Sequence, residues 1–219
     1  MNAALRLREI HDRVAKAGRI ARREPAEVTL VAVSKTHPAQ SVALLLEAGH
    51  RTFGENRVQE AAAKWPALRE RWPDARLHLV GRLQSNKAED AARLFDCIHS
   101  LDRPNLVGAL ARAFDKLGRR VESFVQVDVG EEPQKGGCPV AGLPALLAEA
   151  RAANLPVIGL MCVPPAGIEP APFFALLDKL ARDNGLAGRS MGMSGDFETA
   201  VMLGATHIRV GTALFGERS

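Results

Sequence analysis

The segment VTLVAVSK, residues 28–35, is a short apolar run that ends in a lysine. Its aliphatic and β-branched residues do not alternate with polar ones, which is typical of strands buried on both faces. The same character recurs in seven later runs, and together they predict eight buried strands. The later runs cover residues 51–55, 76–83, 95–101, 121–130, 155–163, 189–193 and 206–211.

Amphipathic stretches separate these runs, for example residues 38–49 and 171–185. Several of them end at Gly or Asn, the usual signals for the end of a helix. Strict alternation of strands and helices predicts a parallel sheet, and eight strands favour closure into a TIM-type (β/α)8 barrel. A further amphipathic helix, over about residues 3–23, is expected before the first strand. An open doubly wound sheet is the alternative fold.

The length also favours a single domain. Barrels of this kind typically have about 250 residues, so the 219 residues here leave no room for a second domain beside one that spans residues 1–219. Hydrophobic residues at 47% and charged residues at 25% are ordinary for a soluble globular protein. Since no apolar run approaches the roughly 20 residues of a membrane span, no membrane partner is expected.

Charge and cysteine content exclude other classes of function. The formal net charge is +4, and the arginines are scattered rather than clustered in a basic stripe, so no nucleic-acid partner is expected. The three cysteines lack C-x-x-C spacing, which favours a reducing compartment and a cytoplasmic location. No group of Cys, His and Asp has the spacing of metal ligands, so no metal site is expected.

Lys35 is the first candidate for chemistry. It follows the first predicted strand, and barrel enzymes place their active sites at the carboxyl ends of the strands. An amine rooted in an apolar wall is partly desolvated, which favours the neutral form that attacks an aldehyde to give a Schiff base. The alternative is a solvated lysine in an ordinary loop.

The last two predicted strands are followed by candidate phosphate ligands. Such barrels often bind phosphate with the loops after strands seven and eight and a helix N-terminus. Ser194 and Gly195 lie where a helix is expected to begin, and Gly211 and Thr212 follow the eighth strand. Hydroxyl and backbone N–H donors there would face Lys35 across the barrel mouth. The alternative is ordinary turn chemistry.

Arg209 lies two residues before Gly211, on the same face of the eighth strand. A guanidinium in that place would donate to a pyridine nitrogen and keep it unprotonated, because arginine does not lose its proton in proteins. An unprotonated ring is a weak electron sink, which argues against transaminase-type chemistry. A structural ion pair is the alternative.

Three further loops are rich in polar residues. In FGENRVQE, residues 53–60, Asn56 is a candidate to lie against a ring or to cap a helix, and Glu55 to orient a neighbour. Residues 81–87, GRLQSNK, offer ligand contacts or helix caps. Residues 130–137, GEEPQKGG, form a loop whose Lys135 is a candidate secondary amine.

These strings together resemble the pyridoxal phosphate (PLP) homeostasis protein family, single-domain relatives of the alanine racemase N-terminal domain. The resemblance covers about residues 5–218. The matching motifs, in order, are VAVSKTHPA, FGENRVQE, LVGRLQSNK, GEEPQKGG, GLMCVPP and SMGMSGDFETAVMLGATHIRVGTALFGER.

The resemblance implies a monomeric PLP-binding barrel of the third PLP fold type, concerned with vitamin B6 balance and without established catalysis. It implies that apo forms of PLP-dependent enzymes are candidate recipients. Arg57, Arg82 and Gly195 depart from residues common in the family, which affects only the outer pocket. The resemblance makes Lys35 the Schiff-base lysine, Ser194, Gly211 and Thr212 the phosphate site, Arg209 the partner of the pyridine nitrogen, Asn56 a neighbour of the ring, and Lys135 an aid to exchange.

A PLP-dependent amino-acid racemase is the alternative function. Racemisation needs a base on each face of the α-carbon, and in alanine racemases these are the Schiff-base lysine and a tyrosine from a second domain on the partner subunit. The chain contains no tyrosine, and no motif singles out His37, His78 or Cys162 as a substitute. A carrier of PLP that is not an enzyme is therefore the preferred interpretation.

Overall fold

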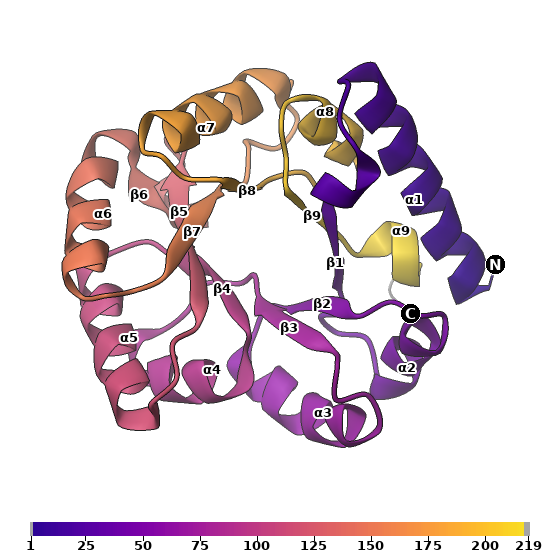
Figure 1. Cartoon of the computed structure of the whole chain (residues 1–219), viewed down its shortest axis with the longest axis horizontal. Helices are drawn as coiled ribbons and strands as arrows, with labels where there is room; N and C mark the ends of the chain where they lie inside the picture. Colours follow the sequence, from indigo (N-terminus) through magenta and orange to yellow (C-terminus); the bar gives the residue numbers. More distant parts are fainter. Residues whose placement is uncertain (1, 217–219) are drawn as a thin grey trace.

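The structure is a computed structural model that describes residues 2–216. Eight strands in this part of the chain close a parallel barrel, with β1 paired to β9 and β4 to β5. This ring confirms the predicted (β/α)8 fold over the open sheet, and Figure 1 looks along it. The barrel strands are β1 (Thr29–Val33), β2 (Thr52–Glu55), β3 (Arg76–Leu79), β4 (Cys97–Leu101), β5 (Glu122–Asp128), β7 (Val157–Met161), β8 (Gly188–Ser190) and β9 (His207–Val210).

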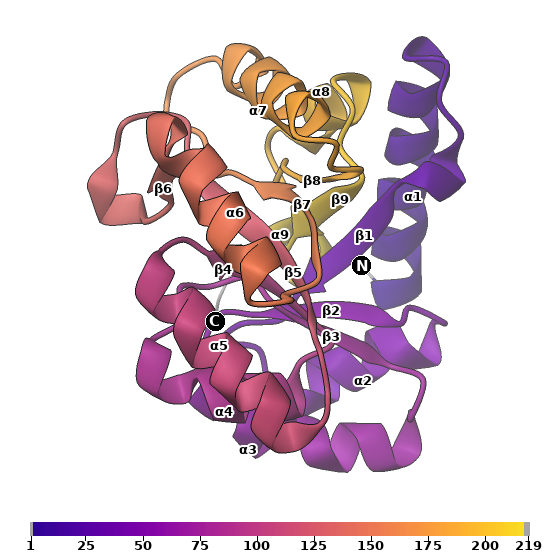
Figure 2. The same ribbon diagram turned by 60° about the vertical axis from the view of Figure 1, so that its left-hand side comes forward.

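Helices surround the barrel (Figures 1 and 2). The predicted N-terminal helix is confirmed as α1, which packs beside the last two helices, α8 and α9. Within residues 2–216 no helix is long and apolar enough to cross a membrane. The helices are α1 (Ala3–Ile20), α2 (Ala39–Glu47), α3 (Val58–Arg71), α4 (Ala88–Leu94), α5 (Pro104–Leu117), α6 (Leu143–Ala152), α7 (Ala171–Asp183), α8 (Phe197–Met202) and α9 (Thr212–Phe215).

Short elements fill the remaining connections. The two-residue strand β6 (Cys138–Pro139) pairs with β5 outside the ring. Single turns of 3-10 helix lie in four of the connections in the described chain, at η1 (Pro25–Glu27), η2 (Ser85–Lys87), η3 (Pro133–Lys135) and η4 (Val140–Gly142).

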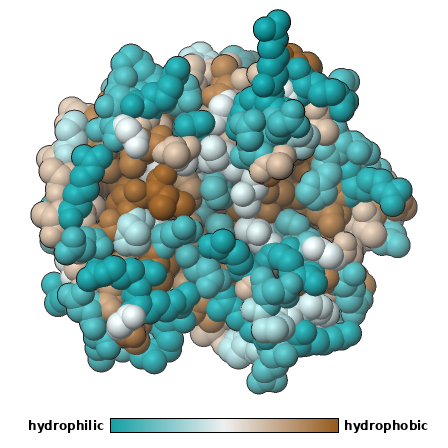
Figure 3. All heavy atoms as spheres, in the orientation of Figure 1, coloured by the Kyte–Doolittle hydropathy of each residue, from teal (hydrophilic) through white to brown (hydrophobic). Residues whose placement is uncertain are grey.

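Side chains alternate along each strand between two compartments. In β1, Leu30 and Ala32 belong to the large core between barrel and helices, as do Ile208 and Val210 of β9. The residues between them face the barrel interior, because successive strand side chains point to opposite faces. This alternation explains why the strands are buried on both faces. Figure 3 shows hydrophilic side chains over most of the molecule's rim.

The barrel interior is partly polar. Cys97, Phe124 and Met161 form a small apolar cluster there, and the rings of His99 and His207 lie against Phe124. Polar groups in such a place are stable when they are hydrogen-bonded to one another. The interior is therefore a packed layer beneath the barrel mouth.

Candidate functional site

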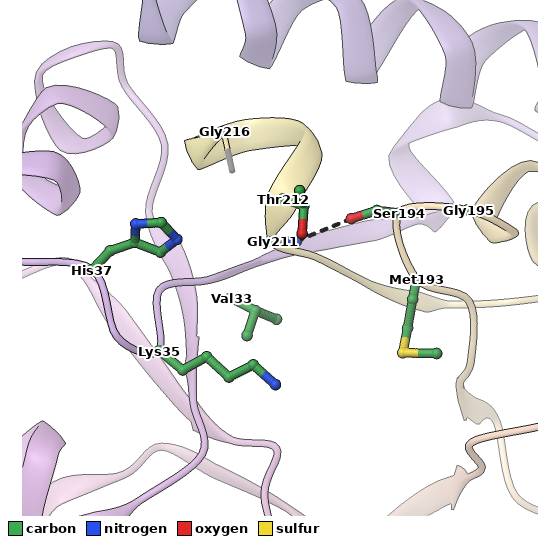
Figure 4. A pocket seen from close by; sticks show the side chains of 9 residues that line it. All are labelled: Val33, Lys35, His37, Met193, Ser194, Gly195, Gly211, Thr212 and Gly216. Carbon is green, nitrogen blue, oxygen red and sulfur yellow. Dashed lines mark hydrogen bonds between the residues drawn. The ribbon is translucent and has the colours of Figure 1, made fainter. Parts of the chain in front are cut away.

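Lys35 follows β1 and lines a cavity of about 270 Å³. The strand ends at Val33, and a turn over residues 34–37 leads to α2. Lys35 extends from this turn across the cavity toward Met193 in the loop after β8 (Figure 4). The structure therefore places Lys35 at the carboxyl end of the barrel, where the sequence predicts a site.

The opposite wall carries the predicted anion ligands. Ser194, Gly195, Gly211 and Thr212 line the same cavity as Lys35. The N–H of Gly211 donates to Oγ of Ser194 over 3.4 Å, so the loops after β8 and β9 are in contact. The amine and these donors are thus brought together, as predicted from strand order.

One detail of that prediction was wrong. Ser194 and Gly195 do not begin a helix, since α8 starts at Phe197 and Asp196 precedes it. The carboxylate of Asp196 accepts the N–H of Met193 at 2.6 Å, which closes a turn over Ser194 and Gly195. The N–H groups of Asp196 and Phe197 also donate to the oxygen of Met193, at 3.1 and 2.9 Å, so this turn leads directly into α8.

Gly211 keeps the backbone of the cavity wall accessible. A Cβ at this position would lie 3.2 Å from the backbone oxygen of Val33 on the neighbouring strand. A side chain would therefore press on β1 just before Lys35. Thr212 begins α9, and the first N–H groups of a helix have no partner within it. These donors suit an anionic group.

His37 also lines the cavity. Its ring stacks on Phe215 of α9, with 4.7 Å between the centroids. This contact joins the turn after β1 to the last helix and forms one side of the cavity.

Asn56 lies in a neighbouring cavity of about 570 Å³. That cavity is lined by the loops after β2 and β3, including Arg57 and Arg82. The capping alternative for Asn56 was wrong, because the residue before α3 is Arg57 and it makes no side-chain cap. Whether Asn56 contacts a ligand ring stays a prediction.

Arg209 lies inside the barrel, beneath the mouth, and is 5% exposed. Its Nη1 donates to the backbone oxygen and Oγ of Ser190 at 2.8 and 2.7 Å, and its Nη2 to the oxygen of Cys162 at 2.8 Å. These acceptors are uncharged, so the hydrogen bonds of Arg209 are not the ion pair that was the alternative interpretation. Burial lowers the pKa of Arg209, although arginine keeps its proton in proteins.

Histidines extend this hydrogen-bonded network. Oγ of Ser190 lies 2.8 Å from Nδ1 of His99, and Nε2 of His99 lies 2.9 Å from Nδ1 of His78. Burial lowers the pKa of His99 and lowers that of His78 to about 3. Both rings are therefore neutral at physiological pH.

The barrel interior contains a group of potential metal ligands that spacing in the sequence does not reveal. His78, Cys97 and His99 place one potential ligand atom each within 4.8 Å of one another. The barrel closure brings β3 and β4 together, which linear spacing does not reveal. The two histidines are already hydrogen-bonded to each other, and burial raises the pKa of the Cys97 thiol.

The three candidates for a second base lie in different surroundings. His37 lines the Lys35 cavity, whereas His78 and Cys162 are buried and are not among the cavity's lining residues. Burial raises the pKa of Cys162 to about 12. Lys135 lies elsewhere and donates to the oxygen of Pro164 at 3.1 Å.

Sequence reasoning missed Lys64 and underestimated Glu55. Glu55 ends β2 and is fully buried, and Nζ of Lys64 in α3 lies 2.7 Å from its Oε1. Lys64 also donates to the carbonyl oxygens of Ser34 and His37 at 2.9 Å each. A lysine among three alanines and a tryptophan in a helix gives no sequence signal of such contacts.

The arrangement suits a small molecule with two reactive features. The amine of Lys35 can attack a carbonyl carbon, and the hydroxyl and N–H groups of Ser194, Gly211 and Thr212 can bind an anionic group. Both lie on one cavity of about 270 Å³. The described side chains therefore fit a phosphorylated aldehyde.

Comparison with known proteins agrees with this geometry. The model of the family "Alanine racemase, N-terminal domain" matches residues 5–219. The pyridoxal phosphate homeostasis protein of Pseudomonas aeruginosa is 42% identical over 216 residues, with 94% of this chain and 91% of the relative covered. That of Aquifex aeolicus is 38% identical over 228 residues, with 100% and 99% covered.

Solved structures give the same result. PipY of Synechococcus elongatus with PLP bound has a TM-score of 0.80 and 41% identity, covering 94% of this chain and 100% of PipY. PipY without PLP has a TM-score of 0.85. Alanine racemase of Clostridium difficile, at 15% identity and a TM-score of 0.71, shares the fold over 56% of its length.

Proposed function

This chain belongs to the alanine racemase N-terminal domain family, and from that premise we propose that it binds PLP and serves PLP homeostasis. Curated relatives at 38–42% identity over nearly the whole chain carry the name pyridoxal phosphate homeostasis protein. PipY, at 41% identity, has been solved with PLP bound. The supporting observation in this chain is that Lys35 and the Ser194, Gly211 and Thr212 donors line one cavity.

Lys35 holds the cofactor covalently in this proposal. When bound, PLP would supply an aldehyde, and Nζ of Lys35 is the amine that would hold it covalently with release of water. Because hydrolysis reverses this reaction, Lys35 would hold the cofactor reversibly and could release it. Ser194, Gly211 and Thr212 bind the phosphate through hydroxyl and N–H groups. Arg209 would donate a hydrogen bond to the ring nitrogen, and Asn56 would lie beside the ring.

A carrier is favoured over an amino-acid racemase. The relatives at 38–42% identity are named for homeostasis, and the racemases among the similar structures share only the fold at 15–17% identity. His37 lines the cavity, but its ring stacks on Phe215. The sequence contains no tyrosine to act as the opposite base.

Location, assembly and recipients complete the proposal. Cys97, Cys138 and Cys162 are all free thiols, which supports a reducing compartment such as the cytoplasm. We propose a monomer, and apo forms of PLP-dependent enzymes as recipients of the cofactor. Lys135, in the loop after β5, assists exchange.

Covalent labelling tests the proposal. Mixing the protein with PLP should produce the visible absorbance of a Schiff base, and borohydride should then fix one cofactor mass on the peptide that contains Lys35. Lys35→Ala should abolish the label, whereas the control Lys179→Met, at an exposed lysine of α7, should retain it. Labelling at another lysine, or no labelling, would refute the proposed function.

A further inference from the structure

Lys35 lies in a turn with an unfavourable backbone. The N–H of His37 donates to the oxygen of Ser34 at 3.1 Å, so residues 34–37 form a β-turn with Lys35 in its second position. Thr36, in the third position, has φ of 65°. A β-branched residue rarely adopts this left-handed conformation, so contacts from outside must hold the turn.

Helix α3 supplies those contacts. The carboxylate of Glu60 accepts the N–H of Thr36 at 2.6 Å. One turn further along the helix, Lys64 donates to the oxygens of Ser34 and His37, at the two ends of the turn. Glu60 and Lys64 also lie 3.3 Å apart as an ion pair. Three backbone groups of the turn are therefore bound by two side chains of one helix.

The barrel anchors this arrangement through Glu55. Its Oε1 lies 2.7 Å from Nζ of Lys64 and accepts the hydroxyl of Ser34 at 2.6 Å and the indole N–H of Trp65 at 3.1 Å. Glu55 is fully buried, and the side chain of Lys64 is 7% exposed. Charges desolvated to this extent are held in fixed positions by their hydrogen bonds.

We infer that Glu55, Glu60 and Lys64 are positioning residues that hold the 34–37 turn so that Lys35 reaches across the cavity. This inference rests on the proposed Schiff base at Lys35. Lys64 itself is too deeply engaged to compete as the covalent amine, since its ammonium contacts two carbonyl oxygens and two carboxylates.

A purely stabilising ion pair is the competing explanation. Buried ion pairs are weak evidence for stability. In addition, Lys64 donates two of its hydrogen bonds to carbonyl oxygens of the turn, which lie outside its own helix. A stabilising role predicts that all ligand binding falls together with folding. A positioning role predicts that only the covalent step falls.

Two ligands separate these roles. PLP reports phosphate binding plus the covalent step, whereas pyridoxine 5′-phosphate has an alcohol in place of the aldehyde and reports noncovalent binding alone. In Glu60→Ala and Lys64→Met, we expect the rate of Schiff-base formation to fall at least about tenfold, because small displacements of a reacting group have large kinetic effects. The affinity for pyridoxine 5′-phosphate should change less than about twofold.

Matched variants make the test specific to the turn. Glu60→Gln keeps an oxygen acceptor for the N–H of Thr36 and should restore most of the rate lost in Glu60→Ala. Thr36→Gly removes the backbone conflict, because glycine adopts positive φ freely, and should partly rescue Lys64→Met. Lys179→Met and Glu47→Ala, on other helices, are controls with unchanged rates.

Each outcome decides a separate point. Thermal unfolding of the ligand-free variants identifies any that fail to fold. If Lys64→Met fails to fold, the test is made with Glu60→Ala, because the Glu60 side chain is 29% exposed. A wild-type protein that forms no Schiff base refutes the proposed function. Wild-type rates in both variants, or a parallel loss of affinity for pyridoxine 5′-phosphate, overturn the positioning role alone.

Discussion

The guanidinium of Arg209 donates through Nη1 to Oγ of Ser190 at 2.7 Å, entirely within the barrel interior. The same nitrogen binds the backbone oxygen of Ser190, and Nη2 binds that of Cys162. Arg209 of β9 is thereby joined to β8 and to the residue that follows β7. The interaction stabilises the strands that carry the predicted phosphate loops.

Arg209→Met should therefore destabilise the ligand-free protein. The oxygen of Ser190 keeps the N–H of Cys162 and the Ser190 hydroxyl keeps His99, so the loss falls mainly on the buried oxygen of Cys162. An unsatisfied group of this kind lowers the free energy of unfolding by about 1–3 kcal/mol. Urea unfolding followed by circular dichroism measures it. Arg182→Met, an exposed surface arginine paired with Asp178, is the control and should change stability by less than about 1 kcal/mol. Equal effects of the two changes would contradict the structural role of Arg209.

Loss of the hydroxyl at Ser194 or Thr212 should weaken phosphate binding selectively. We expect Ser194→Ala and Thr212→Val each to lower PLP affinity about tenfold, because one charge-assisted hydrogen bond contributes about 1.5–3 kcal/mol. Affinity for pyridoxal, which lacks the phosphate, should stay the same. Thr29→Val, at the opposite end of the barrel where β1 begins, is the matched control. Parallel losses for PLP and pyridoxal would show that these hydroxyls do not bind the phosphate.

Stability should fall in mild acid. Burial lowers the pKa of His50 and His207 to about 4 and that of His78 to about 3. Between about pH 6.5 and these values, the unfolded chain binds protons that the folded protein does not, so the free energy of unfolding decreases as the pH falls. Each histidine contributes up to about 1.4 kcal/mol per pH unit.

His50 allows this contribution to be isolated. Its Nε2 lies 2.7 Å from the oxygen of Thr52, away from the Lys35 cavity. His50→Gln keeps a donor for that oxygen but cannot take up a proton. Urea unfolding between about pH 7 and pH 4.5 should show a shallower loss of stability for the variant. An unchanged pH dependence would mean that His50 does not titrate abnormally.

Amino-acid racemisation should be negligible. After long incubation of the PLP-loaded protein with a panel of L-amino acids, chiral analysis should find no accumulation of D-isomers above the level of free PLP. The physical reason is that the described residues lining the cavity include no tyrosine to act as the opposite base. Turnover at enzyme-like rates, about 1 s⁻¹ or faster, would replace the carrier with a racemase. In that event His37→Asn would test the histidine that lines the cavity.

The sequence predicted the strands well because their signal is local. Apolar runs such as residues 28–35 and 206–211 are buried on both faces, and each became a barrel strand within a few residues of its predicted ends. Lys35 and Gly211 were predicted to line a cavity for the same reason. A strand end can be located in the sequence, and barrels of this kind place their sites at the carboxyl ends of the strands.

Contacts between side chains of elements far apart in the sequence could not be predicted from the sequence. Lys64 and Glu55 lie on a helix and a strand, and their pairing depends on how α3 packs against β2. The His78–His99 contact likewise needs the register of two strands. The start of α8 was misplaced by two residues, because a turn over Ser194 and Gly195, closed by backbone and side-chain hydrogen bonds between Met193 and Asp196, precedes the helix.

The closing pair of the barrel, β1 with β9, also has a consequence for biogenesis. Lys35 is synthesised before Gly211 and Thr212, and Gly211 lies 176 residues later in the sequence (211 − 35). At about 5–20 residues per second, the interval is on the order of ten seconds or more. A nascent chain during that interval has its reactive amine but not the wall opposite it. The cavity with both of its walls therefore forms only after synthesis has passed Thr212, and a chain that stops before this residue lacks the wall opposite Lys35.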